Sequence, residues 1–164
     1  MSKEIEKQNI QNFWGSLYDS LYGDVDQDLT REQLLEALQA QEEMFRFRGH
    51  MAVADMPLGD LAGKHVLEIG PGAGGHSAMF AKYGAIVTSA DITLTRSLST
   101  QAKFNLMDDL AKGCQAIQSD AENLPFGDDS FDIVYSNGVL HHTSDTERAI
   151  AETYRVLKPG GQAV

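Results

Sequence analysis

The sequence has one cysteine, few basic residues and no long apolar run, and each shortage excludes a class of protein. Cys114 alone cannot form an internal disulfide, and charged residues stand where a secretory leader needs an apolar run, so we expect a cytoplasmic protein. No apolar stretch approaches the ~20 residues of a membrane-spanning helix. Thirteen basic against 24 acidic residues give a formal net charge of −11, which repels nucleic-acid phosphates and anionic lipid headgroups. We therefore expect neither a nucleic-acid nor a membrane partner, unless a local basic patch overrides the overall charge.

Residues 4–22 place apolar and aromatic side chains three and four positions apart, which predicts a helix with one apolar face. Trp14, Tyr18 and Tyr22 are aromatic residues of this segment. The spacing fits a helix packed on the body of the protein, and it also fits a mobile lid over a ligand. Both interpretations stay open.

A second helix is predicted from Thr30, which forms a capping-box pattern with Gln33. Helical structure therefore precedes the first strand. The chain lacks internal repeats and low-complexity linkers, and 164 residues suffice for one sizeable core. We divide it into an N-terminal helical cap or lid at 1–55 and an α/β domain at 56–164.

From Lys64 onward, short apolar strands alternate with amphipathic helices, which is the pattern of a parallel sheet built from βαβ units. We predict strands near 64–69, 85–90, 114–119 and 131–136, and helices near 74–83, 94–112 and 145–157. Ser144 and Glu147 form a capping box for the last helix. Residues 158–161, Lys-Pro-Gly-Gly, are expected to end that helix and turn the chain, just before a fifth strand begins.

The most informative segment is an apolar strand that runs through Glu68 into a glycine-rich turn at 70–75 and then into a helix. Glycines let the backbone approach a ligand closely, and the helix start aims free N–H groups at it. Gly70, Gly72 and Gly75 also satisfy the dinucleotide fingerprint. The turn therefore predicts a nucleotide-like ligand, but it does not separate an NAD enzyme from an adenosylmethionine enzyme.

Acidic residues close the next two strands. Asp91 lies 21 residues after Gly70, where a carboxylate can accept both hydrogen bonds from a ribose diol, as in NAD enzymes. Asp120 is followed by 121–126, which places a carboxylate and a backbone N–H where an adenine edge could be read. This feature is less expected of a dehydrogenase. We interpret Glu122 as a solvated loop charge.

Five segments carrying these features follow one another in order: Glu68–Gly74, Asp91, Asp120–Phe126, Phe131–His142 and Arg155–Gly161. Together they resemble the successive motifs of the class I S-adenosylmethionine-dependent methyltransferases, specifically the small-molecule branch called type 11. The resemblance covers residues 64–161. It implies a Rossmann-like parallel sheet, S-adenosyl-L-methionine as the cofactor, and methyl transfer to a small-molecule acceptor.

The resemblance also implies roles on the methionine side of the cofactor. Three glycines of the turn would lie under the methionine part: Gly70, Gly72 and Gly74. Glu68 would organise that loop. Asn137 and Gly138, after the fourth strand, would contact the methionyl moiety through their backbone.

On the adenosine side, the resemblance implies that Asp91 holds the ribose hydroxyls and that Ile92 lies against the adenine face. Asp120 would accept a hydrogen bond from the adenine amino group, and the Ala121 N–H would meet a ring nitrogen. Because a sulfonium is positively charged, a pocket rimmed by acids is electrostatically reasonable.

The histidines are the candidates for proton transfer. His141 and His142 follow the fourth strand, where a methyl acceptor would approach, and one of them could act as a general base. A pair there without a catalytic role is the alternative. His76 is expected to cap or line the glycine turn, and His50 and Arg48 to close the cofactor pocket and meet the cofactor carboxylate. No metal-ligand spacing is present, so we expect no metal.

The main departure from the family is length, because the family sheet usually has seven strands and this chain supplies four with the start of a fifth. We expect a truncated piece that lacks the C-terminal strands, or two copies that pair as a homodimer through the exposed apolar edge of the fourth strand. Two alternatives remain for function. One is an NAD(P)-dependent oxidoreductase, and the other is a non-catalytic module that binds S-adenosylmethionine.

Overall fold

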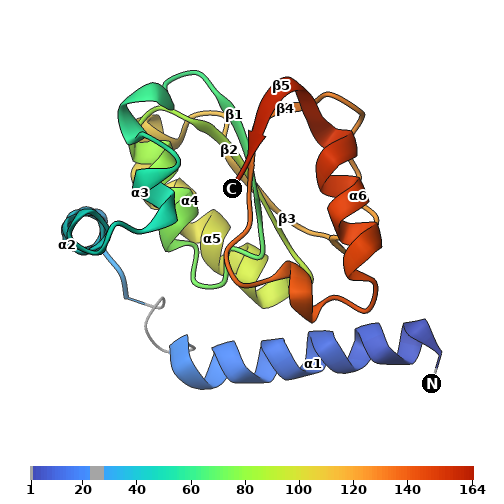
Figure 1. Cartoon of the computed structure of the whole chain (residues 1–164). Coiled ribbons are helices and arrows are strands. Elements are labelled where there is room, and N and C mark those ends of the chain that lie inside the picture. Colours follow the sequence, from blue (N-terminus) through green and yellow to red (C-terminus); the bar gives the residue numbers. More distant parts are fainter. Residues whose placement is uncertain (1, 23–27) are drawn as a thin grey trace.

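Five parallel strands form the centre of the computed structural model, which describes residues 2–22 and 28–164 (Figure 1). The strand order is β3-β2-β1-β4-β5. The strands are β1 (His65–Ile69), β2 (Ile86–Asp91), β3 (Gln115–Gln118), β4 (Phe131–Tyr135) and β5 (Leu157–Ala163). The helices are α1 (Lys3–Tyr22), α2 (Arg31–Arg48), α3 (Met51–Ala54), α4 (Gly75–Lys82), α5 (Leu94–Met107) and α6 (Thr146–Val156), with 3₁₀ turns η1 (Leu58–Asp60), η2 (Asp108–Ala111) and η3 (Leu140–His142). The predicted Rossmann-like parallel sheet with N-terminal helices is confirmed.

The central strands β1 and β4 are covered on both faces, which is why they read as mostly apolar runs, whereas the edge strands β3 and β5 are more exposed. Because successive residues of a strand point to opposite faces, Val66 and Tyr135 join the core shared with α2, α3, α4 and α5. Leu67 and Val134 join a second core with Ala149 of α6. Figure 1 shows α6 on the opposite side of the sheet from α3, α4 and α5. Residues of α2 thus share a core with the sheet, while the domain boundary near residue 55 stays a prediction.

The predicted elements between residues 64 and 157 are all present, with bounds shifted by a few residues. The helix predicted over 94–112 is the largest difference. It ends at Met107, because Asp108 adopts a positive φ of 54° and the chain continues as the 3₁₀ turn η2.

The fifth strand is longer than predicted, and residues 158–161 are part of it and not a turn after the helix. Leu157 pairs with Phe131 and Gln162 with Ile133, so the intervening residues bulge out of the β4–β5 ladder. Lys158 precedes a proline, which favours extended backbone, and proline is tolerated at an edge strand or a bulge. The prediction that the fourth strand is an exposed edge is therefore wrong, because β5 covers it. Pairing of two copies through the sheet edge would involve β5, and it stays a prediction.

Of the two predicted helix caps, that of α2 is correct and that of α6 is wrong. Thr30 Oγ1 accepts a hydrogen bond from the Gln33 N–H at 3.2 Å, and the Gln33 side chain accepts from the Thr30 N–H at 2.9 Å, so the capping box of α2 is confirmed. The N-cap of α6 is Asp145 and not Ser144, because the Asp145 carboxylate accepts from the Arg148 N–H at 3.0 Å.

Helix α1 crosses the end of the molecule where the strands finish, and α5 and η3 lie directly above it in Figure 1. It confirms the helix predicted over 4–22. No described helix has the combined length and apolar character that crossing a membrane requires. Tyr22 belongs to α1, but its side chain lies outside the described residues.

Candidate ligand-binding site

A cavity of about 130 Å³ lies between the carboxyl ends of the strands and the inner face of α1. Ligands of open parallel sheets bind at this edge. The roof consists of four side chains of α1: Lys7, Ile10, Trp14 and Tyr18. The volume is below the ~300–1,000 Å³ of typical small-molecule sites. A nucleotide-sized ligand therefore requires the roof to move.

Eight of the ten residues predicted to bind the cofactor line this cavity: Gly70, Gly72, Asp91, Ile92, Asp120, Ala121, Asn137 and Gly138. They come from the loops after β1, β2, β3 and β4, segments far apart in the sequence that the parallel sheet brings to one edge. Glu68 and Gly74 are the two that do not line it. Their roles, like those of the other eight, stay predictions.

The glycine turn presents backbone to the cavity because side chains do not fit there. Gly70 and Gly72 both have positive φ, at 71° and 56°. A Cβ on Gly70 would lie 2.5 Å from a methyl carbon of Val139, and one on Gly72 would lie 2.6 Å from the hydroxyl of Tyr18. Gly74 packs instead against Thr100 of α5. The turn is thus enclosed on three sides by α1, α5 and the loop after β4.

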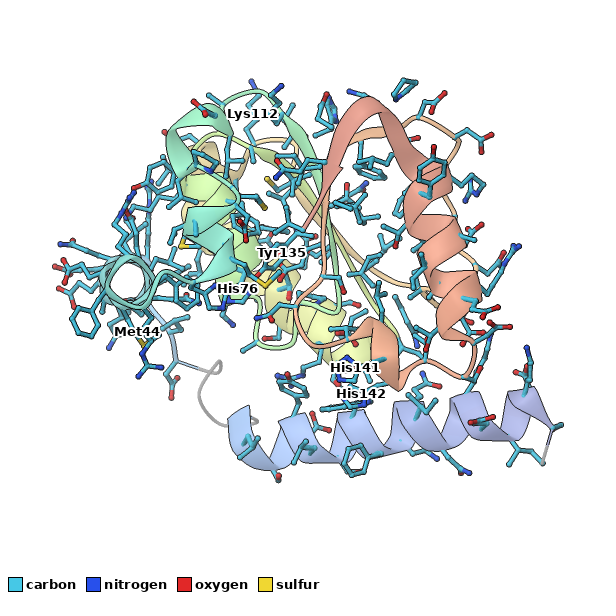
Figure 2. All side chains as sticks on the ribbon, viewed as in Figure 1. Met44, His76, Lys112, Tyr135, His141 and His142 are labelled. Atoms are coloured by element: carbon cyan, nitrogen blue, oxygen red, sulfur yellow. The ribbon has the colours of Figure 1, made fainter. Side chains whose placement is uncertain are left out.

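Glu68 ties β1 to the first turn of α4. It is only 2% exposed, and its carboxylate accepts a hydrogen bond from the Ser77 hydroxyl. His76 Nδ1 lies 3.5 Å from Glu68 Oε1 and 3.2 Å from the hydroxyl of Tyr135, and Figure 2 shows these two rings beside each other, apart from His141 and His142. These contacts fit the predicted organising role of Glu68. His76, expected to cap or line the turn, belongs to this cluster and does not line the cavity.

Asp91 is held in place by Thr93, two residues later in the chain. Its Oδ1 accepts hydrogen bonds from the N–H and the hydroxyl of Thr93, both at 2.8 Å. Burial raises the pKa of Asp91, and the hydrogen bonds from Thr93 and the positive charge of Arg96 oppose that rise. The carboxylate is therefore held in a fixed position at the end of β2. A hydrogen-bond donor on a ligand there would offset part of the free-energy cost of burying its charge.

Asp120 lies opposite a cation from α1. Lys7 Nζ is 2.5 Å from Asp120 Oδ2 and 2.8 Å from Glu122 Oε2. Asp120 Oδ1 accepts from the Glu122 N–H at 2.9 Å. Burial lowers the pKa of Lys7, but the hydrogen bonds to the two carboxylates raise it by more. The net result is a pKa above the usual value for lysine. Asp120, which the resemblance expects to accept from the adenine amino group, thus already accepts from the ammonium group of Lys7.

Glu122 is not the solvated loop charge that the sequence predicted. It is 6% exposed, and its Oε1 accepts from the Ser144 hydroxyl at 2.7 Å and from the Asp145 N–H at 2.9 Å. Burial alone would raise the pKa of Glu122, but the hydrogen bonds from Lys7 and Ser144 bring the net shift below the usual value. Glu122 therefore joins α1 to the start of α6.

Further contacts fix α1 over the cavity. Gln11 Nε2 donates to the carbonyl oxygen of Ile92 at 3.0 Å. The ring of Trp14 lies 4.9 Å from that of His142, and Asp19 accepts from Arg96 Nη2 at 3.2 Å. Of the two interpretations of this helix, the structure has it packed on the body of the protein, over the cavity, while its role as a mobile lid over a ligand stays a prediction.

The two neighbouring histidines differ in their relation to the cavity. His142 lines it, and His141 does not, although their ring centres are only 4.0 Å apart. Both lie next to α1 in Figure 2. On the other side, His50 caps α3 by accepting from the Ala52 N–H, and burial lowers its pKa. Neither His50 nor the exposed Arg48 lines the cavity.

Sequence reasoning missed two cations of the site, Lys7 and Arg96. Lys7 lies on the same helical face as Trp14, and a basic residue seven positions before an aromatic residue of that face was the available signal. Arg96 is 5% exposed in the first turn of α5 and lines the cavity. Within residues 2–22 and 28–164, no group of three or more His, Cys, Asp or Glu could hold a metal ion.

A protein-family model described as "Methyltransferase domain" matches residues 67–164. Phthiotriol/phenolphthiotriol dimycocerosates methyltransferase 1 of Mycobacterium ulcerans (strain Agy99) is 36% identical over 104 residues, which cover 62% of this chain and 36% of that protein. Sterol 4-C-methyltransferase strm-1 of Caenorhabditis elegans is 32% identical over 100 residues, or 61% of this chain and 30% of that one. The solved structure of YcgJ from Bacillus subtilis matches with a TM-score of 0.58 at 32% identity, over 68% of this chain and 48% of that one. The chain thus spans 30–36% of the length of these two curated relatives.

Proposed function

The chain belongs to the methyltransferase domain family, and from that premise we propose that it binds S-adenosylmethionine and transfers the cofactor's methyl group to a small molecule. The observation that carries the proposal is the meeting of the glycine turn with the carboxylates of Asp91 and Asp120 around one cavity. A nucleoside offers hydroxyl and amino donors to such carboxylates, and a sulfonium offers a positive charge. The names of the relatives support methyl transfer to small molecules.

The residues of the cavity fit this cofactor chemically. The bare backbone of Gly70 and Gly72 leaves room that a Cβ would fill, and the carboxylates at the ends of β2 and β3 can accept donors from ribose and adenine. Ile92 supplies apolar surface for the flat base. Because the cavity is small, Lys7 and Tyr18 have to withdraw for the ligand to enter.

The protein's contribution to the reaction is positioning. S-adenosylmethionine supplies an electrophilic methyl group on a positively charged sulfur. The strand ends hold the donor, and α1 excludes water and brings the acceptor into line with it. No metal is needed for such a displacement.

The acceptor side of the cavity is lined by Trp14 and His142, which pack against each other. Where the nucleophile of the acceptor carries a proton, His142 is the group placed to take it, because it lines the cavity and its neighbour does not. The acceptor itself would be small and largely apolar, in keeping with Ile10, Trp14 and Val139 on the lining.

Calorimetric titration of the purified chain with S-adenosylhomocysteine, beside NADH, tests the cofactor. We expect micromolar binding of S-adenosylhomocysteine alone, and loss of that binding in Asp91→Ala, whose carboxylate accepts from ribose. Asp60→Ala, on the 3₁₀ turn η1 outside the cavity, is the matched control and should bind as the wild type does. Binding of NADH alone would favour the oxidoreductase. Cofactor binding without turnover on any member of an acceptor panel would favour the non-catalytic module.

A further inference from the structure

Arg96 is a buried cation that lines the cavity and is only partly paired. Its side chain is 6% exposed, and its Nη2 donates to Asp19 of α1 at 3.2 Å. Its guanidinium carbon lies 5.8 Å from the ring centre of Tyr18. Asp19 itself is half exposed, at 52%. Among the described residues, the ion partner of this buried charge is therefore Asp19, a surface residue on the roof.

The other guanidinium donors of Arg96 face no acceptor. Within the part of the chain that the structure describes, neither Nε nor Nη1 has a hydrogen-bond partner, and both atoms are buried. Buried polar groups of native proteins are nearly always paired, and a charged donor is the costliest to leave unpaired. Because Arg96 lines the ligand cavity, these two donors are available to a ligand that brings oxygen acceptors.

The surroundings of Arg96 favour a particular kind of oxygen. The carboxylate of Asp91, five residues before Arg96 at the end of β2, also lines the cavity. The positive charge of Arg96 acts on this carboxylate. An anionic ligand group would gain from the guanidinium but would be repelled by this carboxylate. A hydroxyl is compatible with both, because it donates its hydrogen to the carboxylate and accepts from the guanidinium through its oxygen.

We propose that Arg96 is a cofactor-binding residue that donates hydrogen bonds to the ribose hydroxyl oxygens of the adenosyl group, while Asp91 accepts from the same hydroxyls. The inference rests on the proposed function, since it requires an adenosyl ligand in this cavity. A purely structural Arg96 would act only through Asp19 and Tyr18, to hold α1 in place. The two roles differ in what a substitution does to ligand affinity.

The test is calorimetric titration of four proteins with S-adenosylhomocysteine and with 5′-methylthioadenosine, which lacks the amino-acid carboxylate. The proteins are the wild type, Arg96→Met, Asp19→Asn and Arg31→Met. Arg31 is a half-exposed arginine on α2 outside the cavity, so its variant is the matched control for loss of a guanidinium. Asp19→Asn removes the ion partner on α1 and leaves Arg96 in place.

We expect Arg96→Met to weaken both ligands by the same factor, about tenfold to hundredfold, because hydrogen bonds from a charged donor to the ribose are lost. Asp19→Asn and Arg31→Met should stay within about threefold of the wild type. A 2′-deoxy form of methylthioadenosine should lose part of its sensitivity to Arg96→Met, since one acceptor is already gone.

Three results would overturn the assignment. If Arg96→Met binds both ligands as tightly as the wild type does, Arg96 does not contact the ligand. If Asp19→Asn weakens binding as much as Arg96→Met does, Arg96 acts by holding α1 in place. Weakening of S-adenosylhomocysteine alone assigns the guanidinium to the carboxylate and not to the ribose. Should Arg96→Met fail to fold by circular dichroism, Arg96→Lys, which keeps the charge but loses the planar donors, replaces it and is expected to weaken both ligands. Failure of the wild type to bind either ligand would instead refute the proposed function.

Discussion

The floor and the roof of the cavity are built on different physical principles. The floor consists of loops that follow β1, β2, β3 and β4, and three of these strands, β1, β2 and β4, are largely buried. The roof is one helix, α1, in which no described side chain is fully buried. Ion pairs and hydrogen bonds from Lys3, Lys7, Gln11 and Asp19 join it to the body. Because partly exposed ion pairs contribute little stability, we expect the roof to open at a smaller free-energy cost than the floor.

For the proposed function, this difference would let the protein hold its cofactor in a fixed site and still admit it. The floor keeps Asp91 and the glycine turn in a fixed geometry, whereas the roof occupies part of the ligand's space with its own Lys7 and Tyr18. A ligand entering the site exchanges those contacts for its own. Substitutions in the floor should therefore abolish binding, and substitutions in the roof should change its strength.

Gly70→Val attacks the floor and should have the largest effect. The valine would require a positive φ and would overlap the side chain of Val139, so we expect the free energy of unfolding to fall by about 2–4 kcal/mol and binding of S-adenosylhomocysteine to be lost. Denaturant unfolding and calorimetry measure the two effects. Gly59→Ala is the control, because Gly59 has open space around its Cβ position and should change stability by less than about 0.5 kcal/mol. Normal binding by Gly70→Val would mean that the turn is not part of the ligand site.

His142→Ala alters the point where floor and roof meet. With an acceptor whose nucleophile carries a proton, we expect kcat to fall about a hundredfold while the affinity for S-adenosylhomocysteine stays the same. The same substitution at His141, which does not line the cavity, should leave kcat within about threefold of the wild type. Equal losses in the two variants would argue against a specific role for His142.

Lys7→Met loosens the roof without touching the floor. Because the ammonium no longer competes for Asp120, we expect S-adenosylhomocysteine to bind about twofold to fivefold more tightly. The effect should shrink as salt is added, since screening already weakens the ion pair of the wild type. Weaker binding by this variant would show that Lys7 helps to hold the ligand.

Acid should act with opposite signs on Glu122, through which Lys7 holds the roof, and on Asp91 in the floor. The pKa of Glu122 is lowered in the folded chain, so the stability it contributes is present above its unfolded pKa of about 4.3 and is lost as the pH falls through the lower folded value. The pKa of Asp91 is raised, so protonation of Asp91 favours the folded chain as the pH falls through that raised value. We expect the fluorescence of Trp14, the sole tryptophan, to report release of α1 at a higher pH than the loss of the sheet's circular dichroism. Simultaneous loss of both signals would contradict independent regions.

The same division explains what could be predicted from the sequence. The glycine turn, Asp91 and Asp120 belong to local motifs, in which strand, turn and ligand group lie within a few residues of one another. The sheet follows from the alternation of apolar strands and amphipathic helices, and every predicted strand is present. Local patterns therefore sufficed to place the sheet, the glycine turn and these two carboxylates at the cavity.

The errors concern contacts between segments distant in the chain. Glu122 is buried because Lys7, more than a hundred residues earlier, and Ser144 pack against it, and no local pattern around Glu122 reports this. Arg96 lines the cavity and pairs with Asp19 of α1, a contact across 77 residues that no local pattern reports. The bulge at 158–161 depends on pairing with β4, whereas proline and glycine in sequence also fit a turn.

Hydrogen–deuterium exchange of the whole chain, with and without S-adenosylhomocysteine, tests most directly that this cavity holds the cofactor under a movable roof. We expect faster exchange in α1 than in β1 and β4 before ligand is added. Ligand should slow exchange in three floor segments, residues 70–75, 91–96 and 120–122, and should alter exchange in α1. Ligand binding that leaves exchange in these floor segments unchanged, or that protects residues elsewhere, would contradict a cofactor site in this cavity.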